Sequence, residues 1–244
     1  MFKFTVFLTI LFVGVSSWGG FSSLSFAQGS YSITLSSNVT ADPGQTDVSI
    51  YLVLTSASPI GGVDMFLEYD QQVLTCSSIR LLTRFQYVSY DITPAGKIRL
   101  ITRRHHPDST YITPLAPGTD TLGLIKMNVT TQDLLVDMEA KLSYFENPLT
   151  PFIDNRLIKA DSSFINPPEL DLNEGSIFVR HPLYGDVNDD GYPKTIADVI
   201  FFINFIAGSQ NLTSRQRANS DLNRDGVQGN MADFIEIVRA VGEE

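Results

Sequence analysis

Near its C-terminus the sequence reads Asp186-Val187-Asn188-Asp189-Asp190-Gly191, and thirty-five residues later it reads Asp221-Leu222-Asn223-Arg224-Asp225-Gly226. The two segments stay in register beyond their glycines, because Ile196-Ala197-Asp198 aligns with Met231-Ala232-Asp233. Each repeat then continues into an apolar segment with helical periodicity. Internal duplication marks a repeated structural unit. We therefore predict two loop–helix repeats within residues 185–244.

The residue types in each loop are those that bind calcium. This hard cation takes about six to eight oxygen ligands, which a short loop supplies from alternate side chains, one backbone carbonyl and a closing carboxylate. The sharp turn at the sixth position needs a glycine, here Gly191 and Gly226. The sequence thus predicts two calcium ions. The candidate ligands are Asp186, Asn188, Asp190, the carbonyl of Tyr192 and Asp198 in the first loop, and Asp221, Asn223, Asp225, the carbonyl of Val227 and Asp233 in the second.

The loops depart from the EF-hand pattern in their second half. Six residues separate each glycine from the closing acid, one more than in the EF-hand, and that acid is Asp instead of Glu. Because both loops carry the same extra residue, we expect a shared bulge. Counting back from the closing acid places Thr195 and Asn230 where a water-mediated ligand falls. The alternative is two Asp- and Asn-rich turns without an ion, which the in-register duplication disfavours.

The segment Gly185–Gly191, its repeat and the helix after each loop resemble a dockerin module over about residues 185–242. Dockerins are calcium-dependent adaptors that bind cohesin domains, chiefly in assemblies that degrade polysaccharides. The resemblance therefore implies a calcium-binding module whose partner carries a cohesin domain.

The two predicted helices differ in their apolar faces. The second has one apolar stripe, formed by Phe234, Ile237, Val238 and Val241. The first has the matching stripe, formed by Val199, Phe202, Ile203 and Ile206, but its opposite side is apolar as well, through Ile200, Phe201 and Phe205. We expect either that Phe201 and Phe205 are exposed and anchor a partner, or that they pack on Leu183 and Tyr184 or on the preceding domain.

The region from Tyr31 to about Arg180 reads as β structure. Apolar residues alternate with a period of two, which predicts strands over residues 47–54, 63–69, 97–103, 122–129 and 176–179. Turn sequences separate these strands, among them Asp42-Pro43-Gly44 and Pro94-Ala95-Gly96. Many short strands with such punctuation argue for a β-sandwich. We expect residues 147–168 to form a long irregular connection.

Several of these segments are similar to a cohesin, including Gly61–Asp70, Gly96–Arg99, Leu122–Val129 and Glu174–Val179. The resemblance implies a jelly roll of about nine strands. The predicted fold is therefore mainly β with a small α domain. It comprises a cohesin-like β-sandwich (residues 28–180), a linker (181–184) and a dockerin (185–244). The implied partners are cohesin- or dockerin-bearing proteins.

Carbohydrate-binding modules share the same strand pattern, so polysaccharide binding by the sandwich is the alternative. It would need a planar strip of aromatic side chains, which Phe85, Tyr87, Tyr90 and Tyr111 could supply. Residues 28–244 contain no Trp, which argues mildly against such a platform.

The N-terminus and the composition limit the remaining functions. Lys3, the apolar run from residue 4 to 15 and Ser25-Phe26-Ala27 form a signal peptide over residues 1–27, and we expect a secreted chain without a membrane span. The net charge of −10 and the lack of a basic patch argue against nucleic acid. Cys76 is the only cysteine, and His105-His106 is a poor metal pair in a strand. We predict that the protein is not an enzyme.

Overall fold

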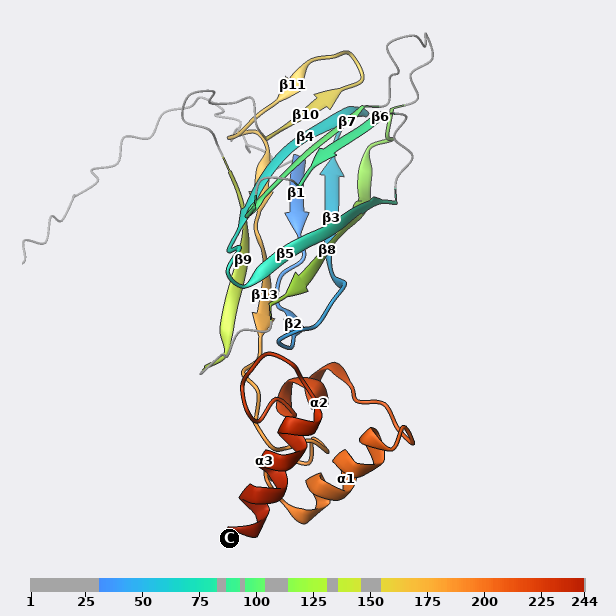
Figure 1. Cartoon of the computed structure of the whole chain (residues 1–244). Coiled ribbons are helices and arrows are strands. Elements are labelled where there is room, and N and C mark those ends of the chain that lie inside the picture. The colour runs from blue at the N-terminus through green and yellow to red at the C-terminus, as the bar shows by residue number, and fades with distance from the viewer. Residues whose placement is uncertain are drawn as a thin grey trace, which may run out of the picture.

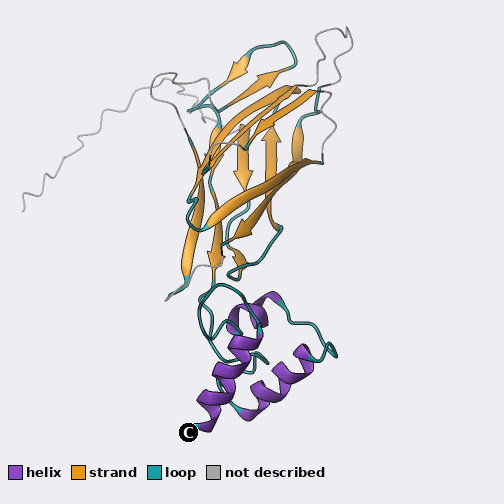
Figure 2. Ribbon diagram, in the orientation of Figure 1, coloured by secondary structure: helices purple, strands orange, loops and turns teal. Residues whose placement is uncertain are grey.

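The computed structural model describes residues 31–82, 87–92, 95–103, 114–130, 136–145 and 155–243. Strands make up the first part of the chain and helices the last part (Figures 1 and 2). The predicted signal peptide and the His105-His106 pair lie outside the described residues. Every helix within these ranges is too short or too polar to cross a membrane.

The β region is built from two sheets. One sheet has the strand order β12-β1-β3-β8-β5, and the other runs β11-β10-β4-β9-β13-β2, with β7 paired to β4 and β6 paired to β7. The strands are β1 (Tyr31–Leu35), β2 (Val39–Ala41), β3 (Val48–Ser56), β4 (Ile60–Tyr69), β5 (Leu74–Leu81), β6 (Tyr87–Asp91), β7 (Lys97–Arg103), β8 (Gly118–Val129), β9 (Met138–Tyr144), β10 (Arg156–Lys159), β11 (Phe164–Ile165), β12 (Asp171–Asn173) and β13 (Gly175–Val179).

Alternation along the strands explains why the two sheets pack together. In β3, Ile50, Leu52 and Leu54 are buried, while Tyr51 between them is exposed. The partner strand β8 runs antiparallel, with Ile50 opposite Ile125, and places Ile125 and Met127 in the same core. Because neighbouring side chains of a strand point to opposite faces, every second residue of each strand enters the layer between the sheets. One core cluster therefore extends through the whole sandwich.

Cys76 belongs to this core. Its thiol donates to the carbonyl of Ser78 (3.9 Å). Burial raises the pKa of the Cys76 thiol to about 11. The thiol is thus protonated near neutral pH and is a poor nucleophile.

The five strands predicted from alternation are confirmed as β3, β4, β7, β8 and β13. The prediction of an irregular connection over residues 147–168 is wrong in its second half. There β10 pairs antiparallel with β4, and β11 pairs with β10. The described residues hold thirteen strands, more than the nine expected. The extra strands are short, and a strand with one or two inward side chains shows no clear period.

The C-terminal module contains α1 (Ile196–Ile206), α2 (Ser214–Asn219) and α3 (Met231–Gly242). Helices α1 and α3 are the two predicted segments, whereas α2 was not predicted. The module has a small core of its own, in which Val187, Phe202, Leu212 and Ile237 are buried. In Figure 1 the module lies beyond the end of the sandwich where β2 and β13 end, with α2 nearest to the strands.

Candidate functional site

The two predicted loops have matching backbones. Three residues in each adopt the left-handed conformation at equivalent places: Asp189, Gly191 and Lys194 in the first loop (φ 63°, 87° and 61°), and Arg224, Gly226 and Gly229 in the second (57°, 82° and 71°). The last of these directly precedes the residue that begins the helix. An additional left-handed turn at Lys194 and Gly229 thus accommodates the extra residue of each loop.

The first acid of each loop accepts hydrogen bonds that stabilise the turn. The carboxylate of Asp186 accepts hydrogen bonds from the backbone N–H groups of Asp190 (2.9 Å) and Gly191 (3.0 Å). Asp221 accepts the equivalent bonds from Asp225 (3.2 Å) and Gly226 (3.1 Å). Both acids are buried. Each acid therefore holds the two N–H groups at the turn of its own loop.

The third and fifth positions are also paired in the same way in both loops. The amide of Asn188 donates to the carboxylate of Asp190 (2.8 Å), and that of Asn223 donates to Asp225 (2.9 Å). The carboxylate of Asp190 also accepts from the backbone N–H of Tyr192 (2.9 Å). The side chain of Tyr192 is exposed, as expected for a position whose role is taken by the backbone carbonyl.

The closing acids lie at the start of the helices and are fully buried. Asp198 accepts from the backbone N–H of Asn188 (3.1 Å) and from both the N–H (2.9 Å) and the hydroxyl (2.8 Å) of Thr195. Asp233 accepts from the N–H groups of Asn223 (3.3 Å) and Asn230 (2.9 Å). These bonds connect the front of each loop to its helix.

Thr195 and Asn230 cap the helices. The Thr195 hydroxyl accepts from the N–H of Asp198, and the Asn230 side chain accepts from Ala232 and Asp233, so each helix begins with a capping box. The sequence predicted these two residues to hold a bridging water. The structure shows them as N-caps, a role that needs the same oxygen-bearing side chains.

The electrostatics of the loops favour a cation. Burial raises the pKa of Asp186, Asp221 and Asp233 above the usual range, and neighbouring carboxylates add to this shift, Asp198 and Asp190 beside Asp186 among them. A raised carboxyl pKa means that the negative charge is unfavourable where it lies. A divalent cation held by the loop oxygens would reverse that penalty, so the donor set fits calcium.

The carboxylates of each loop are turned toward backbone N–H groups. Among the described residues, no three Asp, Glu, His or Cys side chains are gathered as in a formed metal site. Each predicted ligand set also includes an Asn side chain and a backbone carbonyl, which are not among these four residue types. The ten ligands named from the sequence therefore stay a prediction.

Of the two alternatives expected for Phe201 and Phe205, the exposed anchor is contradicted and packing within the protein is favoured. Both side chains are partly buried against the module core. The Phe205 ring lies 6.1 Å from that of Phe202, and the guanidinium of Arg217 lies over it. The segment after α1 covers this side of the helix, with Gln210 donating to the carbonyl of Phe201 (2.6 Å). The second apolar side of α1 is thus internal packing.

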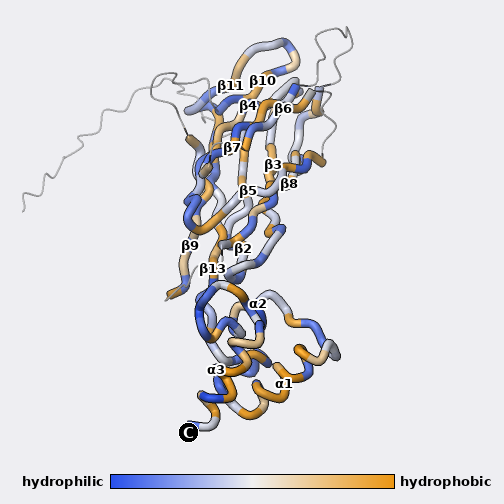
Figure 3. The backbone as a smooth tube through the Cα atoms, viewed as in Figure 1, coloured by the Kyte–Doolittle hydropathy of each residue, from blue (hydrophilic) through white to orange (hydrophobic). Residues whose placement is uncertain are grey.

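The exposed apolar side of α1 is instead formed by Ile196, Ile200 and Ile203, which are 67%, 55% and 48% exposed. Ile203 and Ile206, which the sequence grouped in one apolar stripe with Val199 and Phe202, are exposed, so that stripe does not lie on the core as a whole. Figure 3 shows α1 coloured as hydrophobic along most of its length. Contiguous exposed aliphatic side chains of this kind are typical of interaction surfaces.

Helix α3 carries the equivalent stripe. Met231, Ile235 and Val238 stand thirty-five residues after Ile196, Ile200 and Ile203, and they are 56%, 54% and 45% exposed. Within the apolar stripe predicted for this helix, Ile237 is buried and Phe234 and Val241 are partly buried against the module core, whereas Val238 is exposed. We call the exposed residues of both helices the paired stripes: Ile196, Ile200 and Ile203 on α1, and Met231, Ile235 and Val238 on α3. Aligning the repeats would have revealed them, because these positions are apolar in both helices but lie off the core face.

Known structures share the fold of the sandwich. A chain in the crystal structure of a type I cohesin–dockerin complex from Clostridium thermocellum has a TM-score of 0.51 at 13% identity, covering 63% of this chain and 95% of that chain. A chain in the complex of the third cohesin ScaC with the ScaB dockerin from Acetivibrio cellulolyticus has a TM-score of 0.49 at 15% identity, covering 62% and 99%. The seventh ScaB type I cohesin from Pseudobacteroides cellulosolvens has a TM-score of 0.47 at 15% identity, covering 62% and 92%.

The Clostridium thermocellum match covers 63% of this chain, which is more than the helical module contains, so the match must include the sandwich. The sandwich therefore has a cohesin-like fold, as the sequence predicted. Identity this low shows the fold and not the activity. No protein-family profile matches the sequence, and no curated protein matches it in sequence.

Proposed function

We propose that this protein is an exported, non-catalytic adaptor that joins proteins through a calcium-dependent module. The C-terminal module binds two calcium ions and presents the paired stripes to a partner with a cohesin fold. The sandwich in turn offers a surface for dockerin-bearing proteins, in an assembly that acts on polysaccharides.

The repeated hydrogen-bond pattern supports calcium binding. The two loops share the same types of oxygen ligand and the same left-handed positions, and their first and last acids accept equivalent hydrogen bonds from backbone N–H groups. Asp186, Asn188, Asp190, Asp198 and the Tyr192 carbonyl would hold one ion, and their equivalents the other. When bound, calcium supplies positive charge that offsets the buried carboxylates and fixes the loops.

The paired stripes support protein docking. They lie on helices whose opposite faces form the module core, so they are not needed for internal packing. Their chemistry calls for a partner with an apolar surface that receives helices laid on it. A cohesin-fold domain is the partner that the resemblance to dockerins implies. This duplicated exposed surface is the observation that carries the proposal.

Polysaccharide binding has weaker support. Among the described side chains of the sandwich, the exposed aromatic residues are spread over four strands of both sheets: Tyr51 on β3, Tyr90 on β6, Phe164 on β11 and Phe178 on β13. Phe85 and Tyr111, which the sequence offered for an aromatic strip, lie outside the described residues. A sugar-binding platform needs aromatic rings in one plane. Carbohydrate therefore stays the alternative ligand for the sandwich.

The proposal is tested with a panel of purified cohesin-fold domains encoded in the same genome, this chain's own sandwich among them. The mature chain is immobilised and each domain is passed over it in calcium and then in EGTA. We expect at least one domain to bind in calcium and to dissociate in EGTA. If the whole panel fails to bind in calcium, the adaptor function is contradicted.

A further inference from the structure

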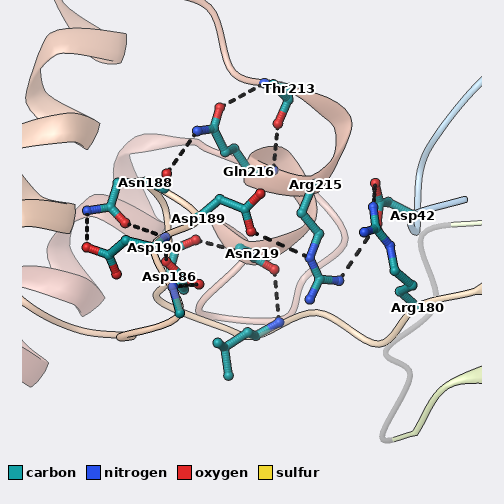
Figure 4. A network of polar contacts seen from close by, with 12 residues as sticks. Asp42, Arg180, Asp186, Asn188, Asp189, Asp190, Thr213, Arg215, Gln216 and Asn219 are labelled. Atoms are coloured by element: carbon teal, nitrogen blue, oxygen red, sulfur yellow. Dashed lines mark hydrogen bonds and ion pairs between the residues drawn. The ribbon is translucent and has the colours of Figure 1, made fainter.

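The turn between β2 and β3 meets the C-terminal module. Its first residue, Asp42, is only 3% exposed, and both carboxylate oxygens accept from Arg180 at the end of the sandwich (3.0 and 2.9 Å). The guanidinium of Arg215, on α2, lies 3.7 Å from the same carboxylate and donates to the carbonyl of His181 (2.7 Å). Figure 4 shows Arg215 pointing from the module toward Asp42. One buried carboxylate thus faces cations from both domains.

A second contact lies beside the first. The amide of Gln228, in the second loop, donates to the carbonyl of Pro43 (2.9 Å). Residues 43–46 of the turn and Ser214, Arg217 and Gln228 of the module line a crevice of about 210 Å³. The turn is itself rigid, because Asp42 and Gln45 exchange hydrogen bonds and Gly44 takes a left-handed conformation. We call this region, the 42–46 turn with Arg215 and Gln228, the joint.

Helix α2 connects the joint to the first loop. The buried side chain of Asn219 donates to the carbonyl of Asp186 (2.8 Å) and accepts from the N–H of Leu183 (2.9 Å). The amide of Gln216 donates to the carbonyl of Asn188 (3.2 Å), and Arg215 lies 4.0 Å from the carboxylate of Asp189 (Figure 4).

A helix of six residues has little stability of its own. The first loop therefore holds α2 in place, and α2 holds Arg215 in place. The residue equivalent to Asp189 in the second loop is Arg224, which packs over Tyr184 instead. The coupling between loop and sandwich is consequently not the same for the two repeats.

We propose that α2 transmits the calcium state of the first loop to the sandwich. With the loop ordered, Arg215 and Gln228 rest on the 42–46 turn, and the module is held with its paired stripes in one orientation. With the first loop released, α2 no longer holds Arg215 against Asp42, and the sandwich loses this contact with the module. The joint thus regulates how the docking surface is presented, and this inference rests on the proposed calcium binding.

Thermodynamic linkage allows the coupling between calcium binding and the joint to be measured from either side. If calcium strengthens the joint, the joint must strengthen calcium binding by the same factor. Calcium should also stabilise the sandwich, since the module contacts its 42–46 turn only in the calcium state. Neither effect is expected of two domains joined by a free linker.

The test uses the full mature chain and two substitutions. Arg215→Met keeps the aliphatic stem and removes the guanidinium from the joint. Arg239→Met, on α3, serves as the control. It makes the same change on the exposed helix surface, where the guanidinium of Arg239 donates to Glu236 (2.9 Å). Calorimetry measures the two calcium dissociation constants, and the melting temperature of the sandwich is measured in calcium and in EGTA.

In the wild type, calcium should raise the melting temperature of the sandwich by about 2–4 °C. Arg215→Met should remove that increment and raise one of the two dissociation constants by roughly five-fold or more. Arg239→Met should change neither. Gln228→Ala removes the second contact. If Arg215→Met does not fold, the same two measurements are made on Gln228→Ala, with the same losses expected.

Wild-type constants and a wild-type increment in both joint variants would overturn the inference, as would an equal loss in Arg239→Met. A wild-type chain that binds no calcium would contradict the proposed function instead. The two failures are therefore distinguishable.

Discussion

Removing calcium is expected to unfold the C-terminal module while the sandwich stays folded. In excess EGTA, we expect the helical circular dichroism signal of residues 196–242 to be lost and the β signal to remain. The described part of the module has few buried apolar side chains, namely Val187, Phe202, Leu212, Ala218 and Ile237, and Cys76, the only cysteine, lies in the sandwich. A core of this size supplies roughly 3–5 kcal/mol at best.

Calcium can supply a similar amount. An ion present at a thousand times its dissociation constant stabilises the folded state by about 4 kcal/mol. Without it, the buried acids, Asp186, Asp198, Asp221 and Asp233, repel one another. Magnesium is the control, because it prefers a smaller and stricter geometry and should restore the signal poorly. A helical signal that persists in EGTA would show that the module folds without an ion.

The second large effect is expected at the paired stripes. Ile200→Asp combined with Ile235→Asp should weaken the binding of a cohesin-fold partner at least about 100-fold, which corresponds to roughly 3 kcal/mol. Both side chains are more than half exposed, so the charges are tolerated in the free protein. In the complex each carboxylate would lie unpaired in an apolar contact. Binding is measured by surface plasmon resonance against the partner found in the panel.

Two controls accompany this variant. Leu82→Asp places the same charge on an exposed apolar residue of the sandwich and should leave binding unchanged. The calcium stoichiometry and the melting temperature of the double variant should equal those of the wild type. Full binding by the double variant would place the docking surface elsewhere on the module.

The loops could be predicted closely because their shape depends on residues near in sequence. An acid at the first position accepts from N–H groups four and five residues later, and a glycine at the sixth takes the left-handed turn. Asp198 and Asp233 likewise bond within the first turn of their helices and to an N–H group only ten residues earlier. Such local constraints leave a clear pattern in the sequence.

The helix faces were predicted less well, since burial depends on distant segments. Two sides of α1 are apolar, and periodicity cannot tell which one is covered. Leu212 and Gln210, which follow α1, decide this by packing against Phe201 and Phe205. The joint between Asp42 and Arg215 leaves no signal at all, because its residues are far apart and lie in turns and a short helix that no pattern reveals.

The central claim is that two calcium ions and the fold of the C-terminal module depend on each other. Native mass spectrometry of residues 28–244 tests it directly by reporting bound mass and compactness on the same molecules. In calcium we expect a compact chain with two ions, one ion in Asp198→Asn and one in Asp233→Asn, and in EGTA a metal-free chain with higher charge states. A compact wild-type chain that carries no calcium in both conditions would contradict the account.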